Sequence, residues 1–312
     1  MHDQSTATGA RERPYTHPAM MRDLATVFAA LLGLAFGSFL NVCVSRWPEG
    51  ESIVQPRSHC MSCGQTLSWW ENLPLASWIA LKGRCRTCRA WIGWRYPLIE
   101  LAVGALWAAA TWQTLAAEGT AFPGTVLVRT AESFCFYWLL VALAALDAEH
   151  FWLPDMLTLP GIAAGFLFTV ADGMLNGGLP SSNWPNAAQH GAGSAALHSL
   201  LAIVGAAAVV GVLRWTYRLI RKREGMGLGD VKLMALLGAW LGFSGALLAL
   251  VLGVSIGALA AVILLVLAAG KGKNEAIWLQ KLPLGTFLCV GGAISGLFGR
   301  EIIAAYLRMV GL

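Results

Sequence analysis

Two aspartates, Asp147 and Asp230, lie at the ends of long apolar segments that otherwise contain almost no carboxylates. The first belongs to the stretch LDAEHFWLPD, and the second closes the stretch GMGLGD. Because an ionised carboxylate at membrane depth is energetically costly, such a residue is a candidate for function. If both carboxyl groups face one water-lined site, they share a proton and can act as an acid and a base. The pair therefore indicates an aspartyl hydrolase.

The composition indicates that lipid surrounds much of this protein. The chain has 312 residues, of which 57% are hydrophobic and 12% are charged, whereas soluble domains carry about twice that charged fraction. We therefore expect a polytopic membrane protein that is embedded in the lipid bilayer. The net charge of +5 does not indicate a nucleic-acid partner, because the basic residues cluster in a few loops, as membrane topology signals do.

Apolar segments that could form membrane helices recur along the chain, and each helix needs about 20 residues to cross the hydrocarbon. We divide the long run from Asp230 to Gly270 at the turn-like cluster 242–245, although the piece before the division is short for a full crossing. The prediction is an all-α protein with about eight transmembrane helices. The segments cover approximately 24–44, 98–117, 126–146, 156–171, 195–213, 229–241, 246–270 and 284–307.

The loops between these segments differ in charge. Cytoplasmic loops of membrane proteins carry an excess of Lys and Arg, so the pattern predicts that both termini lie outside. Asp147 and Asp230 then lie at the same, cytoplasmic face, where they can meet. The loops 45–97, 214–228 and 271–283 contain basic residues, whereas 118–125, 172–194 and 242–245 contain no Lys or Arg.

Four cysteines form two C-x-x-C pairs, Cys60 with Cys63 and Cys85 with Cys88. Each pair can present two thiolates on one tight turn, and the separation of the pairs is close to that of zinc ribbons. Disulfides or free thiols are the alternatives, and a cytoplasmic location argues against disulfides. A site filled by four cysteines has no open coordination position, so we expect a structural Zn²⁺ rather than a catalytic one.

These features divide the chain into four expected parts. Residues 1–23 are polar and are expected to form a disordered tail, followed by a first transmembrane helix over 24–44. Residues 45–97 are expected to form a small, zinc-ribbon-like cytoplasmic domain. Residues 98–312 are expected to form the transmembrane aspartyl protease domain. The loop 172–194 receives no function.

A series of short motifs, taken in order from about residue 24 to residue 300, resembles the type IV prepilin peptidase family. The two C-x-x-C pairs and the motif around Asp147 belong to this series. One departure is the triplet Leu284-Gly285-Thr286, which stands where the family pattern has Phe-Gly-Pro. The other motifs are GSFLNV at 37–42, RWP at 46–48, ENLP at 71–74, RYPLIE at 95–100, LPD at 153–155, GLGDVK at 227–232 and LPLG at 282–285.

The resemblance implies an enzyme of the cell inner membrane, a multi-pass aspartyl protease of the G-x-G-D class. Such enzymes remove the basic leader of prepilins or pseudopilins after a glycine at the cytoplasmic face. Many then methylate the new N-terminal amine with S-adenosylmethionine. Asp147 and Asp230 match the catalytic positions of the family.

For the mechanism, we expect one aspartate to activate water and the other to polarise the scissile carbonyl, with the two roles unassigned because the pair titrates as a unit. Alternatively, Asp147 caps a helix or pairs with a loop arginine. Gly227 and Gly229 let the backbone approach a peptide substrate, or they form an ordinary turn before a helix.

The site of methyl transfer is unmarked in the sequence, because no dinucleotide-binding glycine motif follows a strand. S-adenosylmethionine would therefore use the loop 45–97, the cytoplasmic helix ends, or both. Two other functions would suit the same chain. One is a proton-coupled transporter with the aspartates as relay groups, and the other is a non-catalytic assembly protein with the same fold.

Overall fold

The computed structural model describes residues 17–117, 123–175, 192–222, 227–269 and 282–311. Within these ranges the regular structure is helical and contains no strand, apart from two isolated bridges in the cysteine-containing segment. Seven helices are long and apolar enough to cross a membrane. They are α1 (His17–Arg46), α3 (Arg95–Ala117), α4 (Pro123–His150), α5 (Asp155–Leu175), α6 (Ala192–Arg221), α7 (Leu228–Ala269) and α9 (Leu284–Val310). The all-α membrane fold predicted from the sequence is confirmed.

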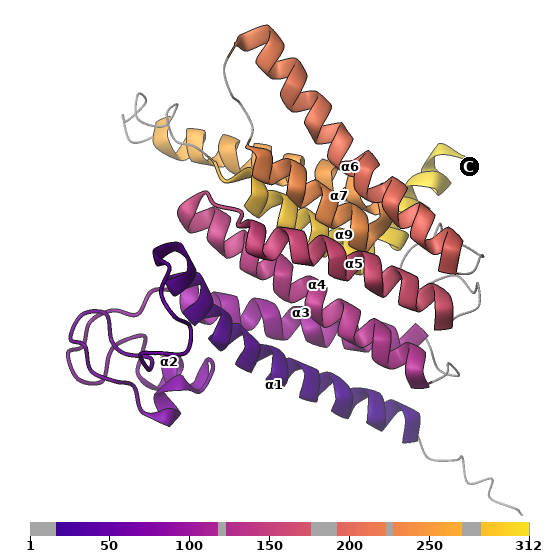
Figure 1. Cartoon of the computed structure of the whole chain (residues 1–312). Helices are drawn as coiled ribbons and strands as arrows, with labels where there is room; N and C mark the ends of the chain where they lie inside the picture. Colours follow the sequence, from indigo (N-terminus) through magenta and orange to yellow (C-terminus); the bar gives the residue numbers. More distant parts are fainter. Residues whose placement is uncertain (1–16, 118–122, 176–191, 223–226, 270–281, 312) are drawn as a thin grey trace, which may run out of the picture.

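The long helices lie side by side, and the segment between α1 and α3 lies at one end of the bundle (Figure 1). Helix α1 packs along α3, while α7 packs between α6 and α9. Helix α4 joins the two groups through its contacts with α3, α5 and α9. The segment between α1 and α3 contains only the short helices η1 (Trp47–Glu49), η2 (Trp69–Asn72) and α2 (Ala76–Ala80).

Close approach of α1 and α3 depends on glycine. A Cβ atom added to Gly37 would lie 2.7 Å from the Cα atom of Glu100, and one added to Gly33 would lie 2.8 Å from the Cα atom of Gly104. Small residues at helix contacts let backbones approach closely in membranes, where packing drives association. The glycines therefore allow the N-terminal part of α3 to pack closely against α1, which positions Glu100 beside the GSFLNV motif.

The expected division of the long apolar run is confirmed as a break at Gly242, which has φ 69° and ψ 177° inside α7. Glycine adopts this left-handed φ without steric cost because it lacks a Cβ atom. The part of α7 before Gly242 measures on the order of 20 Å at the helical rise, which is less than the hydrocarbon thickness of about 30 Å. The two parts count together as one of the seven spans, which accounts for the difference from eight.

The first helix is longer than expected. It begins at His17, so residues 17–23, which were expected to be disordered, are helical. Pro18 is compatible with this start, because the first turn of a helix does not use its backbone N–H groups. Residues 1–16 of the expected tail lie outside the described residues, as do 176–191 of the loop 172–194. The remaining ends of that loop belong to α5 and α6.

Candidate active site

Asp147 lies in the last turn of α4 and is 6% exposed. The backbone N–H of Thr286 donates to its Oδ2 atom at 2.7 Å, and the Thr286 hydroxyl lies 3.2 Å from the same oxygen. Thr286 stands in the first turn of α9, where the partial positive charge of a helix favours a carboxylate. Asp147 thus accepts a capping hydrogen bond from α9. Among the described residues no arginine pairs with Asp147, and Arg95 pairs instead with Glu149 at 2.6 Å.

Asp230 is the third residue of α7 and is 9% exposed. Its neighbour Gly229 packs against Leu153, which also lies beside Gly285, the glycine that contacts Asp147. The side chain of Leu153 lies beside the neighbours of both aspartates. Cβ atoms added to Gly229 and to Gly285 would each lie 3.1 Å from Leu153 Cδ1. The structure therefore places Asp147 and Asp230 around one leucine side chain at one end of the bundle.

The two glycines of the second motif differ in their surroundings. Gly229 leaves room for Leu153, which makes it a packing position. Gly227 is exposed, and a Cβ atom there would lie 3.9 Å from Asp230 Oδ2. Gly227 therefore offers backbone that a substrate can approach beside the carboxylate, whereas Gly229 is enclosed by the protein itself.

Gly285 leaves no space for a side chain. A Cβ atom on it would lie 2.9 Å from both Cγ and Oδ2 of Asp147. Sequence reasoning found this triplet only as a departure from the family pattern and missed the role of Thr286. The one signal for that role was the position of Thr286 beside Gly285 at the start of the last apolar segment.

The resemblance implies that Asp147 is a reacting group of peptide cleavage. We therefore expect Gly285→Ala to lower cleavage on the order of 100-fold, because the new methyl group would displace the Asp147 carboxylate and small misplacements of reacting groups are costly. Cleavage of a prepilin substrate by purified enzyme measures the effect. The matched control is Gly211→Ala in α6, where an added Cβ has nothing within 4 Å. Equal cleavage by both variants would show that Gly285 does not position Asp147.

An ion pair supports the start of α7. Lys232 Nζ lies 2.5 Å from the Oδ1 atom of Asp155, the first residue of α5. The two residues are 77 positions apart in the sequence, so no local motif predicts this contact. The pair links the first turns of α5 and α7 on the flank of Asp230. Its side chains are 35% and 58% exposed, so its contribution to stability is small.

The four cysteines of the predicted metal site lie together. Their sulfur atoms are all within 4.8 Å of one another, and Cys60 Sγ is 3.7 Å from Cys88 Sγ. A tetrahedral zinc with Zn–S bonds of about 2.3 Å requires sulfurs about 3.8 Å apart. The four sulfur atoms are therefore spaced to bind one metal ion. They come from the two C-x-x-C pairs, as the sequence predicted.

Tight turns present these thiols. The Gly64 N–H donates to the Cys60 carbonyl at 2.8 Å, with Gly64 at φ 70°, and the Arg89 N–H donates to the Cys85 carbonyl at 3.1 Å. Slight burial raises the pKa of Cys60, but hydrogen bonds from the Cys63 and Ser62 backbone outweigh it and lower the pKa to about 6. A thiolate at neutral pH is the form that binds a metal.

Comparisons with known families agree with this architecture. The bacterial peptidase A24 N-terminal domain matches residues 31–114, which include the four cysteines. The type IV leader peptidase family matches residues 134–262, which include Asp147 and Asp230. The protein is therefore an aspartic-type peptidase with several membrane-spanning helices. None of the solved structures matches the chain significantly.

Several curated relatives resemble nearly the whole chain, and each is named a prepilin leader peptidase/N-methyltransferase. The relative from Burkholderia pseudomallei (strain 1026b) is 37% identical, and the similarity covers 88% of that protein and 90% of this chain. The relative from Aeromonas salmonicida (strain A449) is 33% identical, with 93% of it and 90% of this chain covered. The relative from Stutzerimonas stutzeri is 32% identical, with 96% of it and 93% of this chain covered. The chain belongs to the type IV leader peptidase family.

Proposed function

We propose that this protein removes the leader peptide from type IV prepilins or pseudopilins and then methylates the new N-terminal amine. The single observation that carries the proposal is the placement of Asp147 and Asp230 around one Leu153 side chain at one end of the helix bundle. The names of the relatives supply the substrate class and the second activity. These names and the family match favour a peptidase over a transporter that uses the same two carboxylates.

The two aspartates perform the hydrolysis in this proposal. One carboxylate takes a proton from water as the water oxygen attacks the scissile carbonyl carbon. The other carboxyl group donates a proton to the oxygen of that carbonyl. When the C–N bond breaks, the leaving amine takes up the proton that was removed from water, and the oxygen returns its proton to the second carboxylate. The exposed backbone at Gly227 lies beside Asp230 and is suited to receive the extended peptide.

The substrate class fits the position of this pair in the membrane. A prepilin carries a basic leader followed by an apolar helix, so it lies in the inner membrane with its leader in the cytoplasm. The pair lies at the ends of α4 and α7, next to helices that lipid can reach. We propose that cleavage follows a glycine at this cytoplasmic face.

Zinc is the metal we propose for the four cysteines. The four-thiolate geometry matches its preferred tetrahedral coordination. Residues 47–94 contain only three short helical turns and no buried hydrophobic side chain besides Cys85. Because so small a core cannot stabilise a domain, we assign the metal a structural role.

A mass measurement tests the proposed function. The purified enzyme is incubated with a synthetic prepilin, with and without S-adenosylmethionine. We expect leader and mature peptide in both reactions, and an added methyl group on the mature peptide only with the cofactor. Intact prepilin in both reactions would overturn the proposed peptidase activity, and cleaved but unmethylated product would overturn the second activity alone.

A further inference from the structure

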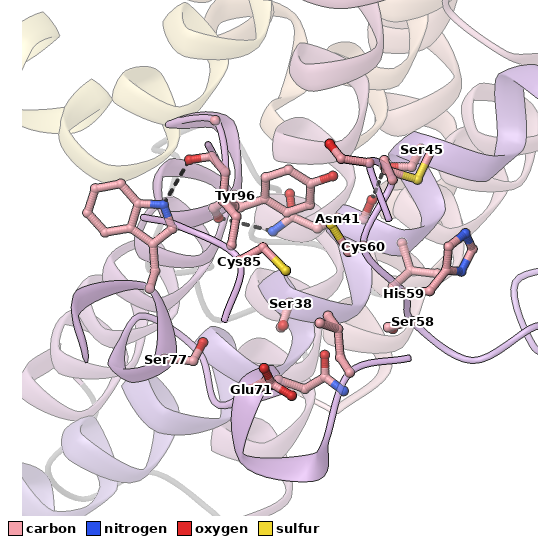
Figure 2. A pocket seen from close by; sticks show the side chains of 18 of the residues that line it. Ser38, Asn41, Ser45, Ser58, His59, Cys60, Glu71, Ser77, Cys85 and Tyr96 are labelled. Carbon is pink, nitrogen blue, oxygen red and sulfur yellow. Dashed lines mark hydrogen bonds between the residues drawn. The ribbon is translucent and has the colours of Figure 1, made fainter. Parts of the chain in front are cut away.

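A cavity of about 730 Å³ lies between the cysteine-containing segment and the ends of α1 and α3. Figure 2 shows Asn41, Glu71 and Tyr96 around it, together with the metal-site residues Cys60 and Cys85. Small-molecule sites in proteins have volumes of about 300–1,000 Å³ and combine apolar walls with a few polar groups. The volume of this cavity falls in that range, and its lining includes neither Asp147 nor Asp230.

One buried polar atom in the wall lacks a partner. Asn41 is 3% exposed, and its Nδ2 donates to the Tyr96 carbonyl at 3.0 Å. No donor among the described residues reaches its Oδ1 atom. A buried acceptor without a donor is costly. Asn41 lines the cavity, and a ligand N–H group that reaches this atom would satisfy it.

Two carboxylates in the wall provide negative charge. Glu100 is 8% exposed and accepts a hydrogen bond from the Leu75 N–H at 2.8 Å. Glu71 is also mostly buried, but both of its oxygens have partners: Oε1 lies 3.7 Å from Nε of Arg86, and Oε2 accepts a hydrogen bond from the Ser68 N–H at 2.8 Å. Among the described residues no cation pairs with Glu100. A buried carboxylate of this kind attracts a positively charged ligand.

Aromatic rings complete the wall. Trp78 and Tyr96 both line the cavity, and Trp78 is held by a hydrogen bond from its Nε1 to the Ile92 carbonyl at 3.1 Å. Aromatic faces attract cations and stack on flat ring systems. The cavity therefore combines surfaces for a flat heterocycle, a positive charge and an N–H donor.

We propose that this cavity binds S-adenosylmethionine and is the site of methyl transfer. The inference rests on the proposed function and specifies the cofactor site. The cofactor has an adenine ring, a sulfonium, an ammonium and several N–H groups, which complement the aromatic rings, Glu71, Glu100 and the Oδ1 of Asn41. It supplies a methyl group: the N-terminal amine forms the new N–C bond as the C–S bond breaks, S-adenosylhomocysteine leaves, and the amine releases a proton to water.

One arginine links the wall of the cavity to the helix end that holds Asp147. Arg95 connects them, because its Nη2 donates to Ser45 Oγ and its Nη1 to Glu149 Oε2, both at 2.6 Å. Ser45 lines the cavity, and Glu149 is two residues from Asp147. Arg95 thus links the wall of the cavity to the last turn of α4, which holds Asp147.

Binding by the full-length protein in detergent tests the inference. Calorimetry is done with S-adenosylmethionine and S-adenosylhomocysteine, using wild type, Asn41→Leu and Glu100→Gln. We expect each variant to raise the dissociation constant of S-adenosylmethionine by at least about tenfold, because each removes one polar contact. The control is Glu301→Gln, the same chemical change at an exposed residue in the second half of α9, which should bind as wild type. Wild-type affinity in both cavity variants would overturn the inference.

A second measurement does not depend on how well the variants fold. Radiolabelled S-adenosylmethionine is crosslinked to the wild-type protein with ultraviolet light, and the labelled peptide is mapped. We expect label at Trp78 or Tyr96, and label confined to other segments would overturn the inference. The same preparation is assayed for prepilin cleavage, so that loss of the proposed peptidase function is recorded separately from loss of cofactor binding.

Discussion

Asp147→Asn and Asp230→Asn should each stop prepilin cleavage, with a fall of roughly 100-fold to 10,000-fold or more. An amide can neither take a proton from water nor deliver one to the leaving amine. It also removes the shared proton on which the pair depends. The measurement is the rate of leader release from a prepilin by each purified variant.

Folding has to be separated from chemistry in this experiment. Both aspartates are mostly buried, so membrane insertion and the thermal midpoint of each variant are measured beside cleavage. Asp23→Asn is the matched control, because the Asp23 side chain is 62% exposed and lies near the N-terminal end of α1. Normal cleavage by either dyad variant, correctly inserted, would end the hypothesis that the two residues act together.

Removal of the metal should have the second largest effect. In Cys85→Ser, we expect bound zinc to fall sharply and methyl transfer to be lost, while leader cleavage continues. Binding of a structural zinc contributes directly to the folding free energy of a small domain. Cys60 and Cys85 line the cofactor cavity, whereas Asp147 and Asp230 lie on α4 and α7. Metal analysis and product masses measure the three quantities.

Cys135→Ser is the matched control for the metal experiment, because Cys135 is exposed on α4 and lies outside the four-cysteine cluster.

Zinc binding should also weaken as the pH falls, since protons compete with the metal for the thiolates. Purified wild-type protein with no zinc and four free thiols would refute the metal site. Loss of cleavage in step with zinc would show that the cysteine-containing segment also supports the aspartates.

The residues to which we assign the chemistry could be proposed from the sequence because their signals are local. A carboxylate in an apolar segment is costly wherever the chain folds, which singled out Asp147 and Asp230. Two C-x-x-C pairs bring thiols together through short turns, which singled out Cys60 with Cys63 and Cys85 with Cys88. The break at Gly242 was likewise visible as a cluster of turn-forming residues.

The contacts that organise these residues were decided by tertiary structure. Thr286 donates to Asp147 across 139 positions of sequence, and Arg95 reaches Glu149 across 54. The cavity around Asn41 forms only when α1, α3 and the cysteine-containing segment pack together. Apolar periodicity specifies that a helix is buried in lipid or protein, but it does not specify which helix end meets which, because many packings satisfy the same pattern. The partners of each polar group therefore depended on the packed bundle.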